Sequence, residues 1–365
     1  MALTQLNIDH VRNLQQVRLR ELQGVNVFSG PNGSGKTSVL ESIHLLGMAR
    51  SFRGNSVKPL IAHGEESCTV YGLTAGPGPA MSLGVRRERS GDAQIKVGGK
   101  PVRAVAELAE QLPLQVITSG SFELLTGPPA ARRQFLDWGV FHVEQFFFSQ
   151  WQRFQRCIKQ RNNLLRRGKI STQELSVWTR DLVIAGTAVS DYRKGYFEEL
   201  APRFKAIMRL LSPTLDELDL HYRQGWDRRL SYEEALRQGE NADREQGYTH
   251  AGPQRADIRV TVGGYVAADT LSRGQQKLAV CAMKLAQGQM MSELKQGQCT
   301  YLIDDLPSEL DDQHASLVCD QLASMDAQVF ITCVKPEEIR VVWPKDQSFG
   351  LFHVEQGTVQ PQAGA

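Results

Sequence analysis

The sequence lacks the features that mark membrane-spanning and secreted chains. No apolar run in its 365 residues approaches the roughly 20 residues that a helix needs to cross a bilayer. The first residues, MALTQLNIDHVRNLQQ, are polar and alternating, without the basic-then-apolar order of a signal peptide. We therefore expect a cytoplasmic protein that does not associate with a membrane.

The cysteines form no recognisable framework. None of them belongs to a CxxC pair, and the six positions are Cys68, Cys157, Cys281, Cys299, Cys319 and Cys333. This scatter argues against a zinc site and against a set of disulfides. We expect structural thiols in a reducing compartment.

The net charge is also small. At +2 it does not by itself indicate a nucleic-acid-binding protein. The distribution is more informative, because residues 126–238 hold 19 Lys/Arg against 13 Asp/Glu, whereas residues 300–365 hold 3 against 11. One part of the chain is basic and another acidic, as expected for directed contact with a polyanion. Two solvated faces of opposite sign would give the same counts.

Hydrophobic periodicity predicts an α/β domain interrupted by a helical insertion. Alternating or apolar runs typical of strands occur at 3–8, 17–19, 25–28, 68–103 (as antiparallel hairpins), 257–262, 299–303, 328–332 and 350–354. A helical spacing follows over 38–48. From about 130 to about 240 the pattern is that of long helices, with breaks at Gly168 and Pro213. We predict one domain formed by residues 1–125 and 248–365, and a mostly helical lobe formed by residues 126–247.

A glycine-rich motif stands between the strand at 25–28 and the helix at 38–48. The phosphate-binding pattern G-x-x-x-x-G-K-[ST] is matched by Gly30, Pro31, Asn32, Gly33, Ser34, Gly35, Lys36 and Thr37. Glycines let successive backbone N–H groups turn toward phosphates, and the helix N-terminus adds partial positive charge. We expect all eight residues to bind ATP, with Lys36 at the β- and γ-phosphates and the Thr37 hydroxyl on Mg²⁺.

The segment Tyr301 to Asp305 reads as a buried strand that ends in two acids, the Walker B arrangement. A carboxylate at the end of a central strand can hold Mg²⁺ opposite Thr37, and we assign that role to Asp304. Asp305 occupies the position at which the ABC ATPases that these motifs resemble carry a glutamate that polarises water. Because aspartate is one methylene shorter, we expect slow hydrolysis, with Asp305 and Lys36 as the catalytic residues.

A third motif, Leu271-Ser272-Arg273-Gly274-Gln275, resembles the ABC signature LSGGQ and precedes an apolar-striped helix. A hydroxyl and N–H groups at a helix N-terminus form an anion site, although the same residues would also suit a plain helix cap. Residues 308–311, Ser-Glu-Leu-Asp, follow at the spacing of the D-loop. In that superfamily the signature contacts ATP on the opposite subunit. The resemblance thus implies nucleotide contacts for Ser272, Gly274 and Gln275, and an ATP-dependent homodimer.

The whole chain resembles the RecF family of bacterial recombination-repair proteins. SMC proteins would need hundreds of coiled-coil residues between the two halves, and transporter subunits belong with a membrane. The stretches that carry the resemblance are Val11-Arg12-Asn13, Leu40-Glu41-Ser42-Ile43, Arg50-Ser51-Phe52-Arg53, Ala131-Arg132-Arg133-Gln134-Phe135-Leu136-Asp137, Phe141-His142-Val143-Glu144, Lys159-Gln160-Arg161-Asn162, Gly252-Pro253-Gln254-Arg255-Ala256-Asp257, and Asp304-Asp305 with Ser308-Glu309-Leu310-Asp311. This chain departs from the family at three places. The family usually has His where this chain has Gln254, a small residue where it has Pro307, and Pro-Glu where it has Ser119-Gly120.

The resemblance implies a fold and a function. The fold is α/β, an ABC-type P-loop ATPase head (a mixed sheet with helices) interrupted by a mostly helical second lobe, and Arg12 contacts the nucleotide. The function is to bind gapped and single-strand/double-strand junction DNA with RecR, to help load RecA onto SSB-coated single strands, with RecO in the same pathway, and to hydrolyse ATP weakly. Two alternatives stay open: a DNA-processing nuclease with an ABC head, and a non-hydrolysing scaffold with a structural nucleotide.

One segment carries a concentrated positive charge. Residues 145–173 contain seven basic residues and no acid. On a helix, an apolar stripe is formed by Phe147, Trp151, Phe154, Ile158 and Leu165. The opposite side, called the cationic ridge below, consists of Arg153, Arg156, Lys159, Arg166 and Arg167. We predict that this helix packs against the protein through the apolar stripe and contacts DNA phosphates through the cationic ridge, without contacting bases. A solvated basic face is the alternative.

Overall fold

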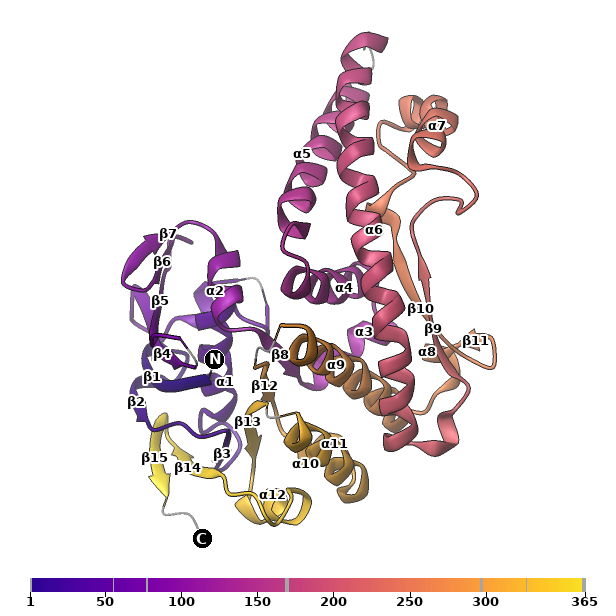
Figure 1. Cartoon of the computed structure of the whole chain (residues 1–365). Coiled ribbons are helices and arrows are strands. Elements are labelled where there is room, and N and C mark those ends of the chain that lie inside the picture. The colour runs from indigo at the N-terminus through magenta and orange to yellow at the C-terminus, as the bar shows by residue number, and fades with distance from the viewer. Residues whose placement is uncertain are drawn as a thin grey trace. The chain divides into compact units, whose positions relative to one another are not determined.

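The computed structural model describes residues 2–54, 56–76, 78–167, 171–295, 298–325 and 327–362 (Figure 1). The chain divides into two compact units. Unit 1 contains residues 1–121 and 277–365, and unit 2 contains residues 122–276. No helix in the described ranges is both long enough and apolar enough to cross a bilayer.

The first sheet of unit 1 is antiparallel, with the strand order β2-β1-β4-β5-β6-β7. Its strands are β1 (Ala2–Val11), β2 (Leu14–Arg20), β4 (Ser67–Ala75), β5 (Met81–Glu88), β6 (Ala93–Val97) and β7 (Lys100–Val102). In β1 the buried side chains change from an odd position, Leu3, to the even positions Leu6 and Ile8. A register shift between Leu3 and Gln5 causes this change, because an inserted residue moves the following side chains to the other face.

The second sheet of unit 1 has the order β15-β14-β3-β13-β12-β8. Its strands are β3 (Val25–Ser29), β8 (Leu114–Ile117), β12 (Thr300–Ile303), β13 (Gln328–Cys333), β14 (Gly350–Glu355) and β15 (Thr358–Gln362). Every pair except the antiparallel β14–β15 is parallel. All residues of β3, β12 and β13 are buried, as required of strands covered on both faces.

Helix α1 (Lys36–Met48) lies between the two sheets of unit 1. It contacts β1, β4 and β5 of the first sheet and β12 and β13 of the second. Eleven of its 13 residues are buried, so it shows no polar face. The other helices of unit 1 are α2 (Val105–Gln111), most of α9 (Arg273–Lys295), α10 (Leu306–Glu309), α11 (Asp312–Ser324) and α12 (Pro336–Val342).

Unit 2 is mostly helical and carries a small three-stranded sheet. Its helices are α3 (Glu123–Thr126), α4 (Pro129–Val143), α5 (Phe147–Arg166), α6 (Thr172–Leu211), α7 (Tyr232–Gln246) and α8 (Ala267–Thr270). The strands β9 (Leu218–Arg223), β10 (Asp257–Val262) and β11 (Tyr265–Val266) pair in the order β11-β10-β9. Helices α5 and α6 run side by side (Figure 1).

The unit boundaries differ from those predicted from the sequence. The units divide after residues 121 and 276, whereas the sequence patterns placed the boundaries after 125 and 247. The second difference arises because β10 pairs with β9 along its whole length and so joins the sheet of the helical lobe. The prediction of helix throughout 130–240 is wrong for β9. The predicted break at Pro213 is confirmed by a 3-10 turn, while Gly168 lies outside the described residues.

Candidate nucleotide-binding site

The glycine-rich loop joins the buried strand β3 to helix α1. Gly30, Gly33 and Gly35 have φ angles of 152°, 80° and 120°, a region that favours glycine. A Cβ on Gly30 would lie 2.1 Å from the carbonyl oxygen of Val354, so any larger residue at this position would clash with the backbone of β14. Helix α1 has neither a side-chain cap nor an acid in its first turn. Its first N–H groups therefore suit an anion.

Two turns from other parts of unit 1 brace this loop. The Asn13 side-chain amide, between β1 and β2, donates to the carbonyl oxygen of Ser34 at 3.0 Å and accepts from the Ser38 hydroxyl at 2.9 Å. The N–H of Gly357, between β14 and β15, donates to the same Ser34 carbonyl at 2.9 Å. A Cβ on Gly357 would lie 2.1 Å from the Asn13 carbonyl oxygen. The loop is thus held in shape by the fold itself.

Lys36 and Ser34 carry the polar groups of the loop that are buried. The Lys36 ammonium donates to the carbonyl oxygens of Gly30 at 2.7 Å and Pro31 at 3.0 Å. The Ser34 hydroxyl is buried and has no hydrogen-bond partner among the described residues. Buried hydroxyls without partners are rare in folded proteins. An anion with several acceptor oxygens would give the Ser34 hydroxyl a partner and would accept from the Lys36 ammonium.

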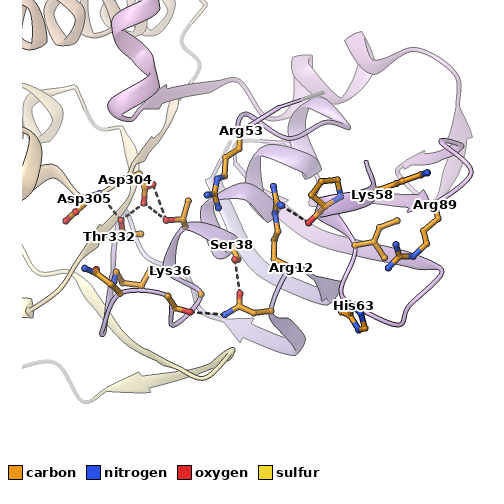
Figure 2. A pocket seen from close by; sticks show the side chains of 17 residues that line it. Arg12, Lys36, Ser38, Arg53, Lys58, His63, Arg89, Asp304, Asp305 and Thr332 are labelled. Carbon is orange, nitrogen blue, oxygen red and sulfur yellow. Dashed lines mark hydrogen bonds between the residues drawn. The ribbon is translucent and has the colours of Figure 1, made fainter. Parts of the chain in front are cut away.

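The two acids of the predicted Walker B strand meet the loop at the end of the second sheet. The Thr37 hydroxyl donates to Asp304 Oδ1 at 2.9 Å, although the two residues are 267 positions apart in sequence. Thr332, at the end of the intervening strand β13, donates to the same Oδ1 at 2.8 Å and accepts from the N–H of Asp305 at 2.9 Å. Figure 2 shows Asp304, Asp305 and Thr332 close together. Hydroxyl and carboxylate oxygens of this kind suit Mg²⁺.

Asp305 adopts a backbone conformation that is uncommon for non-glycine residues, although aspartate enters it more often than most. Its φ and ψ are 56° and 50°, the left-handed region. A non-glycine residue there costs about 1–3 kcal/mol, and such residues concentrate at functional sites. The residue precedes α10, in which Pro307 lies in the first turn, where no N–H is needed. The proline that departs from the family pattern is therefore accommodated without loss of a hydrogen bond.

Residues of the phosphate loop and the acids that follow β12 line a cavity of about 720 Å³ within unit 1 (Figure 2). Five cationic side chains line it, against the two carboxylates of the Walker B strand: Arg12, Lys36, Arg53, Lys58 and Arg89. The sequence motifs did not single out Lys58 or Arg89, which come from the first sheet and its connections. Such an excess of positive charge suits a polyphosphate ligand.

The Arg12 side chain is already largely engaged. It donates to both carboxylate oxygens of the fully buried Glu41, at 2.8 and 2.7 Å, and to the Pro59 carbonyl at 2.6 Å. The hydrogen bonds to Glu41 raise the pKa of Arg12. Since a guanidinium has five N–H donors, two remain for a nucleotide. The predicted contact stays a prediction.

The signature residues lie at the start of α9, in unit 2. The Ser272 hydroxyl accepts from the N–H of Gln275 at 3.3 Å, and the Gln275 side chain accepts from the N–H of Ser272 at 2.9 Å. This reciprocal pair is a capping box. Ser272 and Gly274 are exposed. The cap and an anion site use the same atoms, so the geometry is compatible with both interpretations.

Helix α5 packs by the predicted stripe. Phe147, Phe154, Ile158 and Leu165 are buried and Trp151 is half-buried. On the cationic ridge Arg156, Lys159, Arg166 and Arg167 are exposed. Arg153 is half-buried and pairs with Asp181 at 2.8 Å. Four of the five ridge residues thus reach solvent without an acidic partner among the described residues.

Comparison with known proteins identifies the family. A family described as RecF/RecN/SMC N terminal domain matches residues 2–360. Proteins named DNA replication and repair protein RecF from Pseudomonas syringae pv. tomato and Azotobacter vinelandii are each 48% identical over 360 residues, which cover 98% of this chain and 98% of theirs. The chain belongs to the RecF family.

Solved structures show the same fold. One described as the recombination mediator protein RecF-ATPrS in the RecFOR pathway has a TM-score of 0.85 at 24% identity, covering 99% of this chain and 98% of its own. An Smc head domain from Pyrococcus furiosus has a TM-score of 0.60 at 12% identity, covering 100% of this chain and 96% of its own. The predicted fold class, an ABC-type ATPase head with a helical second lobe, is confirmed.

Gln254 stands where the RecF family usually has histidine, and only the nitrogen of its amide is engaged, since the buried Oε1 has no hydrogen-bond partner among the described residues. Its Nε2 donates to the carbonyl oxygens of Thr249 at 3.2 Å and Ala251 at 3.0 Å. These bonds close the turn that carries residues 249–254. A neutral side chain therefore serves this position.

Proposed function

We propose that this RecF-family chain is an ATP-dependent DNA-binding protein that acts in recombinational repair and replication-fork maintenance. The observation that carries the proposal is the pairing of Thr37 with Asp304 beside Lys36, which joins the two halves of a nucleotide site. The names of its relatives, DNA replication and repair protein RecF, support the pathway. The solved relative described as RecF-ATPrS supports the choice of ATP.

The residues of unit 1 fit a nucleoside triphosphate with Mg²⁺. The open N–H groups of the loop, the Lys36 ammonium and the unpartnered Ser34 hydroxyl bind the phosphates. Thr37 and Asp304 hold the metal, which when bound neutralises phosphate charge. Thr332 orients the Asp304 carboxylate through its hydroxyl. Lys36 exchanges its two carbonyl contacts for phosphate oxygens, which are stronger partners for an ammonium group.

Hydrolysis is slow and serves as a switch. Asp305 orients and deprotonates the attacking water, but its side chain is one methylene shorter than the glutamate usual in ABC ATPases. Ser272, Gly274 and Gln275 contact the nucleotide of a second copy, so that ATP holds two chains together. The second copy leaves when the γ-phosphate is lost.

DNA binds on unit 2 through the cationic ridge. The ridge contacts phosphates and not bases, which favours recognition of DNA shape, including gaps and single-strand/double-strand junctions. By family membership we infer that RecR binds together with this protein, and that RecO and RecA act in the same pathway on SSB-coated strands. The dimer formed with ATP presents two ridges to one DNA molecule.

One set of measurements separates this proposal from its alternatives. Phosphate release is measured with and without gapped DNA, and the DNA products are examined on gels. We expect slow release that DNA stimulates, and intact DNA. Cut DNA would favour the nuclease, and ATP binding without phosphate release would favour the scaffold. For the nuclease, a metal-binding cluster of three or more His, Cys, Asp or Glu side chains would be expected, and the described ranges contain none.

The dimer is tested by light scattering during an ATP titration, with and without duplex DNA. We expect the mass to double with ATP and Mg²⁺. Lys36→Met should abolish both nucleotide binding and dimer formation, because the main cation at the β- and γ-phosphates is lost. Unchanged affinity of the variant for a fluorescent ATP analogue would refute the assignment of the site.

A further inference from the structure

Several of the family stretches in unit 2 converge on one segment, residues 243–257. From α5, Arg161 pairs with Asp243 at 2.7 Å, and Asn162 Oδ1 accepts from the N–H of Thr249 at 2.8 Å. From α4, Arg132 pairs with Asp257 at 2.7 Å. The ion pair of Arg161 and Asp243 is almost completely buried. The segment is therefore fixed rigidly beside α5, although none of the proposed nucleotide or DNA contacts uses it.

This segment places a tyrosine next to the C-terminal end of the cationic ridge. A Cβ on Gly247 would lie 3.5 Å from Arg166 Cγ, so the backbone there runs against the ridge. Thr249 is bound to Asn162 of α5. Tyr248 lies between these two contact points. Its ring packs against the imidazole of His250, with ring centroids 4.1 Å apart.

On the same ring rests an exposed arginine. The guanidinium carbon of Arg255 lies 5.4 Å from the centroid of Tyr248. Arg255 is exposed and has no acidic partner among the described residues. A cation over an aromatic face is held by the ring quadrupole. The Arg255 side chain is thus oriented in advance, in contrast to a long side chain that moves freely in solvent.

We propose that Arg255, oriented by Tyr248, is a further DNA-phosphate contact that extends the cationic ridge from α5 onto the segment 243–257. The proposal rests on the proposed function of the ridge. Three exposed arginines, Arg166, Arg167 and Arg255, gather here, against one exposed acid of the segment, Glu245. The DNA footprint on unit 2 then reaches residues that lie nearly 90 positions beyond α5 in sequence.

A guanidinium suits a phosphodiester particularly well. Its planar N–H groups match two phosphate oxygens at once, and each such bond is charge-assisted. Orientation by the tyrosine ring lowers the entropy that binding would otherwise cost. A phosphate contact also explains why Arg255 has no acidic partner in the part of the chain that the structure describes.

The test compares four single variants of the full chain for binding to fluorescent gapped DNA at 50 and 200 mM salt. Arg255→Ala should bind more weakly and should reduce the slope of log K against log salt by about 0.9. The difference from the parent protein should therefore shrink by about 3.5-fold across this salt range. The matched control is Arg259→Ala, an exposed arginine on β10 of the same unit, which should bind like the parent.

Two substitutions at Tyr248 separate charge from orientation. Tyr248→Leu keeps the Arg255 charge but removes the ring, and should weaken binding about two- to fivefold. Tyr248→Phe keeps the ring, loses only the hydroxyl bond to Gln246, and should bind like the parent. Equal weakening by Phe and Leu would overturn the orienting role. Melting temperature and ATP affinity, measured on each variant, show whether a weakened variant is folded.

A triple variant of the ridge distinguishes failure of this inference from failure of the proposed function. Neutralising Arg156, Lys159 and Arg167 together should reduce the salt slope by up to about 2.7. If the triple variant shows the loss and Arg255→Ala matches the Arg259→Ala control, the inference is wrong and the ridge stands. If the triple variant also matches the parent protein, the DNA-binding function of the ridge itself is refuted.

Discussion

Thr332→Val tests whether one hydroxyl positions both acids of the nucleotide site. The substitution keeps the β-branched shape of a fully buried side chain and removes only its oxygen. Asp304 loses one charge-assisted hydrogen bond, worth about 1.5–3 kcal/mol, but keeps the bond from Thr37. The N–H of Asp305 loses its partner, which costs about 1–3 kcal/mol. Even half of the combined loss, if it falls on the catalytic geometry, slows turnover about tenfold to a hundredfold.

The assay for Thr332→Val is phosphate release over a range of Mg²⁺ concentrations at saturating ATP and DNA. We expect a lower maximal rate and a higher Mg²⁺ midpoint, with little change in nucleotide affinity in the presence of EDTA. Thr332→Ser, which restores the hydroxyl, should recover most of the rate. A Thr332→Val protein with the parent rate and Mg²⁺ midpoint would refute the reasoning, as would an equal defect in the serine variant. Urea unfolding checks that lost stability does not account for the defect.

Three further predictions concern unit 1, unit 2 and the dimer. Arg161→Met leaves Asp243 buried without its arginine and should lower the free energy of unfolding by about 3–5 kcal/mol, measured in urea. Burial lowers the pKa of His44 to about 4, so on acidification the unfolded chain binds the proton before the folded chain does. The free energy of unfolding should therefore fall by about 3 kcal/mol between pH 6.5 and pH 4. In urea unfolding over the same pH range, His44→Gln should lack this contribution of about 3 kcal/mol. Mixing Ser272→Arg with Lys36→Met, each inactive alone, should restore part of the DNA-dependent ATPase if the signature acts on the second copy; mixed dimers that crosslink but stay inactive would count against that arrangement.

The parts of the site that are local in sequence could be predicted from it. The phosphate loop is one contiguous stretch whose glycines, lysine and flanking strand and helix all lie within 25–48. The spacing predicted a helix over 38–48, and α1 begins two residues earlier, at Lys36, and ends at Met48. The strand that leads into Asp304 and Asp305 was predicted from its own apolar run. Pairing it with the loop needed only the known order of the motifs.

What could not be predicted depends on contacts between distant residues. Arg161 was counted among the basic residues of α5, but it is buried in an ion pair with Asp243, which lies 82 positions later in the sequence. β9 falls in a segment with helical neighbours and becomes a strand because β10 pairs with it. The bracing of the loop by Asn13 and Gly357 leaves no periodic pattern, since each acts through one amide in a turn. Single hydrogen bonds of this kind have no signature in a sequence.

The strand that leads into the phosphate loop has a consequence for how the protein is made. β3 pairs with β13 on one side and β14 on the other, and both neighbours are synthesised about 300 residues after it. At about 5–20 residues per second, the apolar segment Val25–Ser29 waits about 15–60 s on the ribosome before either partner exists. The Gly357 brace comes later still. A nascent chain therefore carries a complete phosphate-binding motif long before it can bind ATP, and during that time β3 is an unpaired apolar strand open to misassociation.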